Sequence, residues 1–188
     1  MPARTVRGSL PLTGIEISSA ALDEEFVREF AAGYAAAWNG YDSSAMAGLV
    51  TEDVEWHDPA LPAPARGLAE VQAFMETSWR AFPDLRFSQP DPPHISTSGN
   101  LVAWAWRMEG TMRGPIEPPG FAPTGRRMTV DGVDLWQLRD GRIAHYRAFY
   151  DMTDLARQLG IMPPPGSGAE RATVGLQRLQ ARLQRRGR

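Results

Sequence analysis

The sequence contains no cysteine and no lysine, and each absence excludes a class of chemistry. Without cysteine, the chain forms no disulfide, no thiolate metal site and no thiolate nucleophile. Without lysine, a Schiff-base mechanism is excluded, because the 20 basic residues are all arginine. The 3 histidines lie far apart and lack the spacing of metal ligands. We therefore expect a protein that uses neither a metal nor a cofactor.

Several other sequence signals are missing as well. No apolar run is long enough to span a bilayer, and the first residues lack the apolar core of a signal peptide. The formal net charge of −2 gives no reason to expect nucleic-acid binding. The chain also lacks a phosphate-binding glycine loop and a G-x-S-x-G nucleophile elbow. These absences favour a cytoplasmic protein without membrane or nucleic-acid partners, whose chemistry would need only an acid, a base and a shaped pocket.

The chain length and the positions of proline and glycine predict one domain with two tails. The chain has 188 residues and is 43% hydrophobic, which is enough for a substantial core. We predict a flexible arm at residues 1–20, a domain over 21–162, and a Pro/Gly linker with a basic tail at 163–188. The tail repeats leucines at helical spacing, as an amphipathic helix or a frayed tail would. It could remain solvated, contact a neighbouring subunit or lie on an anionic surface.

The spacing of apolar residues predicts an α+β fold. Apolar side chains recur every three or four residues in several segments and alternate in others, which distinguishes helices from strands. The predicted helices cover residues 22–38, 43–49, 68–82 and 153–159, and the predicted extended segments cover 53–59, 84–96 and three strands between 100 and 151. In this order the helices would pack on one side of a curved, antiparallel or mixed sheet.

The last two of these strands are joined by Asp140-Gly141, a strong signal for a two-residue hairpin turn. Residues that face each other across a hairpin point to the same side of the sheet. The turn would place Trp136 opposite His145, Asp134 opposite Arg147, and Gly132 opposite Phe149. That face would combine aromatic walls with titratable groups, as a ligand pocket requires. Its predicted members are Asp134, Trp136, His145, Arg147 and Phe149.

Two segments carry candidate catalytic residues. Asp134 stands among apolar neighbours, where burial would raise its pKa and suit it to proton transfer, although a structural ion pair with Arg147 is an equally good reading. The second segment ends the 53–59 strand with Trp56-His57-Asp58-Pro59. Alternation points Trp56 and Asp58 to one side and His57 to the other. His57 and Asp58 could supply a base and its hydrogen-bonding partner, or they could be an ordinary surface strand end.

The chain has 6 tryptophans, a large aromatic volume for a small domain. Such residues usually form the core, and each indole N–H needs a partner when buried. A hollow with aromatic walls would accommodate several of them as ligand contacts. The aromatic candidates for substrate binding are Tyr34, Trp38, Trp56, Trp104, Trp106 and Trp136.

Several motifs resemble those of a known family. The segments WHDP, AFPDLRF, WRMEGTMRG and APTGRRMTVDGVDLWQLRDGRIAHYRAFYD, with the closing D-L-x-R-Q-L-G, are similar to the SnoaL-like polyketide cyclases, or ester cyclases, of the NTF2-like superfamily. The resemblance covers residues 26–160. It implies a cone of helices wrapped by a bent sheet, a deep pocket and a homodimer formed through the sheet. It also implies cofactor-free acid–base chemistry of the kind used in secondary metabolism.

Within that resemblance, Asp134 matches the family's acid–base aspartate, and Asp58-Pro59 is similar to the base of ketosteroid isomerases. We expect an aldol-type cyclisation or isomerisation of a small hydrophobic carbonyl compound. Asp134 would act as base, His57 or Asp58 as its partner, and Arg147 or His145 would stabilise the enolate oxygen. The same fold also hosts hydratases, dehydratases and epoxide hydrolases, and a non-catalytic module that binds small molecules is the other alternative.

The chain departs from the family pattern at two places. Cyclases of this group often read G-T-H where this sequence reads Gly110-Thr111-Met112. A proline-rich insert, PIEPPGFAPTG, follows at residues 115–125 and is placed to reshape the mouth of the pocket.

Overall fold

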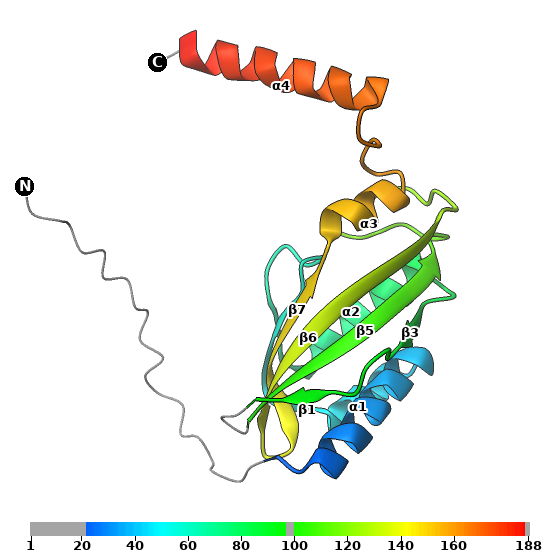
Figure 1. The fold of residues 1–188 in the computed structure, drawn as a ribbon, viewed down its shortest axis with the longest axis vertical. Helices are drawn as coiled ribbons and strands as arrows, with labels where there is room; N and C mark the ends of the chain where they lie inside the picture. Colours follow the sequence, from blue (N-terminus) through cyan, green and yellow to red (C-terminus); the bar gives the residue numbers. More distant parts are fainter. Residues whose placement is uncertain (1–21, 97–99, 187–188) are drawn as a thin grey trace, which may run out of the picture.

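The computed structural model describes residues 22–96 and 100–186, so the predicted arm at residues 1–20 lies outside the described part of the chain. Helices and strands alternate irregularly along the chain, with the three longest strands near its C-terminal half (Figure 1). The elements are α1 (Glu24–Asn39), the 3-10 helix η1 (Ser43–Gly48), β1 (Val50–His57), β2 (Ala65–Arg66), α2 (Gly67–Ala81), β3 (Arg86–Ser88), β4 (His94–Ile95), β5 (Leu101–Thr111), β6 (Arg127–Arg139), β7 (Arg142–Tyr150), α3 (Met152–Gln158) and α4 (Gly168–Arg186).

Local sequence signals start and stop these helices as expected. The side chain of Asp23 caps α1 by accepting a hydrogen bond from the Glu25 N–H, and two glutamates in the first turn complement the helix dipole. Asp151 caps α3 in the same way, accepting from the N–H groups of Thr153 and Asp154. At the start of α2, the Glu70 carboxylate instead accepts from the Arg66 N–H at 2.7 Å. All the predicted helices form, with ends displaced by one or two residues.

The sheet is mixed. Its strands run in the order β2-β1-β7-β6-β5-β3, with β4 also paired to β5. All the pairings are antiparallel except that of β1 with β7, which is parallel. This parallel pair places the end of β1 beside the end of β7, and so brings Asp58 near Tyr150 although the two lie 92 residues apart. The expected α+β layout, helices on a curved sheet, is confirmed.

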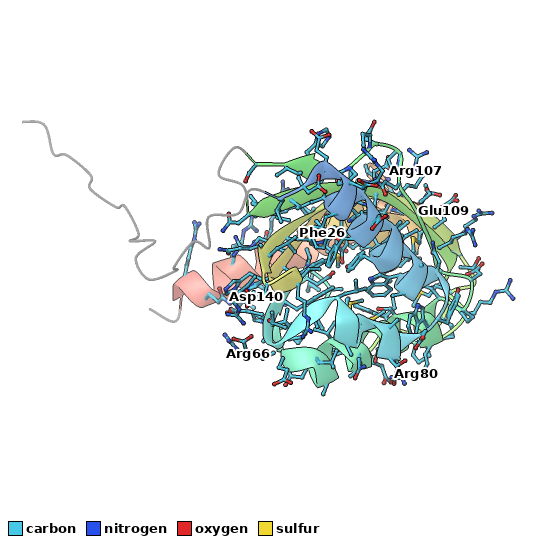
Figure 2. All side chains as sticks on the ribbon, turned by 90° about the horizontal axis from the view of Figure 1, so that it is seen from below. Phe26, Arg66, Arg80, Arg107, Glu109 and Asp140 are labelled. Carbon is cyan, nitrogen blue, oxygen red and sulfur yellow. The ribbon has the colours of Figure 1, made fainter. Side chains whose placement is uncertain are left out.

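One core lies between the helices and the inner face of the sheet. Helices α1 and α2 contribute apolar stripes that include Phe30, Tyr34 and Met75, and the strands contribute Trp56, Trp104 and Trp136. Figure 2 shows side chains filling the space that the curved sheet and these helices enclose. The labelled charged residues Arg66, Arg80, Arg107 and Glu109 point away from it. Burial of this aromatic surface is the main stabilising contribution to the fold.

The register of the β6–β7 hairpin differs from the predicted one. The turn is as expected, with Leu138 opposite Ile143. The register then shifts by one residue, so that Trp136 pairs with Tyr146 and Asp134 pairs with Ala148. The cause is a β-bulge at Ile143-Ala144, two adjacent residues that are both buried. A one-residue shift moves every later side chain of the strand to the opposite face of the sheet.

Three predicted pocket residues are therefore placed on the outer face of the sheet. His145 and Arg147 are exposed, and Phe149 is 50% exposed. The prediction that they line the pocket is wrong, and so is the predicted pairing of Asp134 with Arg147. Their places on the inner face are taken by Tyr146, Ala148 and Tyr150.

Candidate functional site

A cavity of about 240 Å³ opens between the helices and the inner face of the sheet. Its walls are mainly aromatic and aliphatic, with a few hydroxyl groups and two carboxyl groups, a lining typical of a small-molecule site. The lining residues on which the site depends are Tyr34, Trp38, Asp58, Phe74, Thr77, Ser78, Phe87, Trp106, Glu117, Tyr146 and Tyr150.

Asp58 is the interior carboxyl group that reaches this cavity. It follows β1, and because Trp56 points into the core, alternation brings Asp58 to the same side. The Tyr150 hydroxyl and the Ala60 N–H both donate to Oδ1 of Asp58, at 2.7 and 2.8 Å. Burial raises the pKa of this carboxyl above its usual value, and the two hydrogen bonds oppose that rise. Asp58 therefore has one oxygen fixed by the protein and a reduced tendency to ionise.

Asp134 is the second interior carboxyl group, and it lies deeper. Its side chain is 1% exposed on the inner face of β6. The Trp106 indole N–H donates to Oδ1 at 2.7 Å, and the Tyr34 hydroxyl approaches Oδ2 at 3.5 Å. Burial raises the pKa of Asp134 to about 8, although hydrogen bonding from Trp106 and Tyr146 favours the charged form. At neutral pH this carboxyl group is therefore mostly protonated.

Asp134 does not itself line the cavity, whereas Tyr34, Trp106 and Tyr146 do. These three side chains stand between the carboxyl group and the hollow. Burial raises the pKa of the Tyr34 and Tyr146 hydroxyls well above the ordinary value, so both remain protonated donors. Asp134 is therefore linked to the cavity through its contacts with Trp106 and Tyr34 and not by lining it.

The six aromatic candidates divide into two groups. Tyr34, Trp38 and Trp106 line the cavity. Trp56, Trp104 and Trp136 are fully buried behind it and pack around the Tyr34 ring, with centroid distances of 6.3, 5.1 and 4.8 Å. Placing these three tryptophans on the cavity wall was wrong, and they support the wall instead. Trp56 also stacks on the Tyr146 ring at 3.5 Å, which fixes that tyrosine against the cavity.

Comparison with known proteins assigns the fold and the family. Residues 31–146, more than half of the chain, match the family described as the SnoaL-like domain. The chain belongs to the SnoaL-like family. No curated protein sequence matches it significantly.

Solved structures agree with this SnoaL-like assignment. TsrD from Streptomyces laurentii is 25% identical with a TM-score of 0.66, and the match covers 75% of this chain and 99% of TsrD. IdmH from Streptomyces antibioticus, for which a polyketide cyclase role has been suggested, is 27% identical with a TM-score of 0.57, over 70% of this chain and 96% of IdmH. A Catenulispora acidiphila protein described as having a ketosteroid isomerase-like fold is 19% identical with a TM-score of 0.59, over 72% and 98% of the two chains. The expected NTF2-like fold is confirmed.

His57 lies outside the cavity of this SnoaL-like domain. Its Nε2 is 2.9 Å from Oε1 of Glu55, two residues earlier on the outer side of β1. His57, Pro59 and Arg147 line a second, more open hollow, and Asp58 is common to both hollows. The alternation predicted for Trp56, His57 and Asp58 is thus confirmed, and it separates the histidine from the interior carboxyl groups.

The proline-rich insert lies at the mouth of the SnoaL-like cavity. Ile116 and Phe121 form an isolated β-bridge that folds it back on itself. Ile116, Glu117, Pro118, Pro119 and Phe121 all contribute to the lining. Leu155 and Leu159, in and after α3, also line the cavity. Met112, where related cyclases often carry histidine, is fully buried and does not line the cavity.

Two kinds of site are not found in residues 22–96 and 100–186. No three side chains among His, Cys, Asp and Glu gather as metal ligands would. None of the helices in this part of the chain is both long enough and apolar enough to cross a membrane. The polar side-chain groups of the residues that line the SnoaL-like cavity are carboxyl, hydroxyl and indole N–H groups.

Proposed function

We propose that this protein is a cofactor-free acid–base enzyme that acts on a small hydrophobic carbonyl compound by removing a proton from the carbon next to the carbonyl. Aldol-type cyclisation and isomerisation both begin with this step. The observation that carries the proposal is Asp58, a half-buried carboxyl group with a raised pKa that faces an aromatic cavity and has one oxygen to which none of the described residues donates. A carboxylate whose pKa is raised by burial is a stronger base than an exposed one, which favours proton abstraction.

Asp58 takes the role of base that the sequence had suggested for Asp134. Tyr150 and Ala60 hold Oδ1, so Oδ2 is the atom that accepts the substrate proton. None of the ion pairs among the described residues includes this carboxyl group, and its basicity is raised by the same burial that raises its pKa. Asp58 is close to the end of a strand, a rigid position from which a base can be aimed.

Asp134 supplies the acidic half of the site. Its carboxyl group is mostly protonated at neutral pH, because its pKa is about 8. A protonated Oδ2 can donate to the Tyr34 hydroxyl and turn that hydroxyl's own proton toward the cavity. Tyr34 and Tyr146 then stabilise the negative charge that develops on the carbonyl oxygen. Two carboxyl groups in different surroundings thus divide the base and acid roles between them.

The substrate's apolar part would be held by the aromatic wall. Trp38 contacts Phe87 at a centroid distance of 5.3 Å, and Phe87 contacts Trp106 at 5.5 Å, which makes a continuous surface leading toward the carboxyl groups. A cavity of about 240 Å³ suits a compact, one- or two-ring compound.

The test is exchange of hydrogen for deuterium next to the carbonyl group of small cyclic ketones and 1,3-diketones in D2O, followed by NMR. The wild-type protein should catalyse exchange. Asp58→Asn should reduce the rate by about 100-fold or more, as expected for loss of a general base. Asp134→Asn should reduce it less, because the amide of the new side chain would keep a donor toward Tyr34.

A matched control separates this proposal from the alternatives. Asp53→Asn removes an exposed carboxylate from the same strand and should leave exchange unchanged. Exchange that survives Asp58→Asn would refute the role of Asp58. Incorporation of oxygen-18 from solvent water without carbon exchange would favour a hydratase or epoxide hydrolase. Ligand binding without either reaction would favour a binding module.

A further inference from the structure

The charge of the cavity lining is entirely negative or neutral. Asp58 in the interior and Glu117 at the mouth are its charged residues, and no arginine, lysine or histidine is among the described residues that line it. None of the ion pairs within residues 22–96 and 100–186 includes Asp58 or Glu117. His57 and Arg147 are the basic groups near Asp58, and both line the outer hollow instead.

Three hydroxyl groups of the cavity lining, those of Ser78, Thr77 and Tyr150, are better acceptors than donors, whereas Tyr34 and Tyr146 remain donors. Ser78 donates its proton to the Phe74 carbonyl at 2.9 Å, and Thr77 donates to the Ala73 carbonyl at 2.8 Å. Tyr150 donates to Asp58. The Ser78 and Tyr150 oxygens can accept a hydrogen bond from a ligand while their own protons remain engaged, and Thr77 Oγ1, which already accepts from Arg80 at 2.8 Å, keeps one lone pair. An anionic oxygen needs donors, so the part of the wall formed by these three residues suits a carboxylate poorly.

The aromatic wall has the opposite preference. Four aromatic rings form a continuous row of contacts. The centroid distances are 6.1 Å from Phe74 to Trp38, 5.3 Å from Trp38 to Phe87, and 5.5 Å from Phe87 to Trp106. The faces of aromatic rings attract cations through their quadrupole, and the attraction grows where water is excluded. Removing a carboxylate ligand from water without a compensating cation is costly.

We propose that this cavity selects its ligand by charge: it admits uncharged compounds and protonated amines and rejects carboxylates, with Asp58 and Glu117 as the selecting groups. The inference rests on the proposed function only in taking this cavity as the ligand site. It narrows the substrate class to carbonyl compounds whose acid groups are absent, esterified or amidated. An amine on the substrate would be positioned toward Glu117 at the mouth.

The experiment compares three probes of similar size by titration calorimetry at pH 7. They are 2-(1-naphthyl)ethylamine, which is cationic, 2-(1-naphthyl)ethanol, which is neutral, and 1-naphthylacetate, which is anionic. The amine should bind at least as tightly as the alcohol, and the acetate should bind about tenfold more weakly or worse, because like charges repel strongly in a poorly solvated site. Wild-type protein is sufficient for this comparison, so it does not depend on the folding of any variant.

Variants assign the selection to its residues. Asp58→Asn and Glu117→Gln should each narrow the ratio of amine to acetate affinity by about threefold or more, while alcohol affinity changes by less than about twofold. Glu52→Gln removes one exposed carboxylate from β1, outside the cavity, and should leave all three affinities unchanged. If the ratio of amine to acetate affinity fell equally in Glu52→Gln, the net charge of the protein and not the charge of the cavity would be selecting the ligand.

Two outcomes overturn the inference. Acetate that binds as tightly as the alcohol contradicts charge selection, and failure of all three probes to bind contradicts the cavity as their site. The proposed function is judged separately by carbon-bound exchange. Charge selection without exchange on any carbonyl compound would leave this inference standing and refute the enzyme. Exchange without charge selection would support the proposed enzyme and overturn this inference.

Discussion

Replacing Asp134 by asparagine should make the protein more stable than the wild type at alkaline pH, but not at acidic pH. Burial raises the pKa of Asp134 from 3.8 to about 8 in the folded protein. Between those values the unfolded chain releases the proton while the folded chain retains it. The stability associated with Asp134 is therefore complete below about pH 4, declines as pH rises, and is lost once pH passes about 8.

The size of the effect follows from the two pKa values. The interval from 3.8 to about 8, at about 1.4 kcal/mol per pH unit, corresponds to roughly 5 to 6 kcal/mol. This is an upper limit, since water penetration and small movements around an ionised carboxylate reduce its cost. Even a third of that value is large beside the stability of a typical domain, roughly 5 to 15 kcal/mol. We expect a difference of at least about 2 kcal/mol to develop between pH 5 and pH 9.

Asparagine is the informative replacement because it preserves the local hydrogen bonds. Its Oδ1 can accept from the Trp106 indole, and its amide can donate to the Tyr34 hydroxyl. The variant cannot ionise, so it avoids the burial of a charge at high pH. At pH 5 both folded side chains are neutral, and because the unfolded aspartate is already ionised the wild type has lost at most roughly 1.7 kcal/mol, so most of the difference develops above pH 5.

The assay is urea unfolding followed by tryptophan fluorescence at each pH unit from 5 to 9 and constant ionic strength. The measured quantity is the difference in unfolding free energy between variant and wild type. Asp131→Asn is the matched control, because Asp131 is an exposed residue of the same strand and pairs with Arg107 at 2.7 Å. That pairing lowers the pKa of Asp131, so the difference in unfolding free energy between Asp131→Asn and the wild type should not change over this pH range. An equally flat line for Asp134→Asn, or one that falls with pH, would refute the assignment of a buried protonated carboxyl group.

Three further predictions test the rest of the site. Tyr150→Phe removes the 2.7 Å hydrogen bond to Asp58 and should move the acidic limb of the exchange profile to higher pH, because that bond opposes the rise in the pKa of Asp58; an unmoved limb would contradict its role. Gly132→Ala should destabilise the protein by about 1 to 3 kcal/mol in thermal unfolding, because a Cβ there would overlap the Trp106 ring, whereas Gly48→Ala, with open space around it, should not. Arg147→Gln should leave naphthylethanol affinity within about twofold in calorimetry, because Arg147 is on the outer face, and a larger loss would restore the predicted register.

Periodicity predicted much of the fold and the inner-face positions of several candidate residues. Strict alternation in β5 and β6 placed Trp106 and Asp134 on the inner face, where the structure has them. The same reasoning separated Asp58 from His57 at the end of β1. These strands follow the pleat without interruption in the relevant segments, so a two-residue period was sufficient. The type of each element was predictable for the same reason.

The bulge at Ile143-Ala144 is where alternation failed. Both bulge residues are apolar and buried, so nothing in their chemistry marks an extra residue in the strand. A signal was nevertheless present further along the strand. One face of β7 carries His145 and Arg147, and charged side chains are rarely buried without a partner, whereas the other face carries Tyr146 and Tyr150. Giving the charged residues of β7 more weight than the register implied by the hairpin turn would have placed the tyrosines on the inner face.

This single extra residue determines the electrostatics of the site. In the predicted register, an arginine would have lain beside Asp134, lowered the pKa of its carboxyl and supplied a cation for an enolate oxygen. In the observed register, Tyr146 and Tyr150 occupy the inner face, and the interior carboxyl groups meet hydroxyl donors without a cation. A carboxyl group without a counter-ion either retains its proton or pairs with a positive charge on its ligand. Both the protonated state of Asp134 and the charge selection proposed for the cavity follow from the bulge in β7.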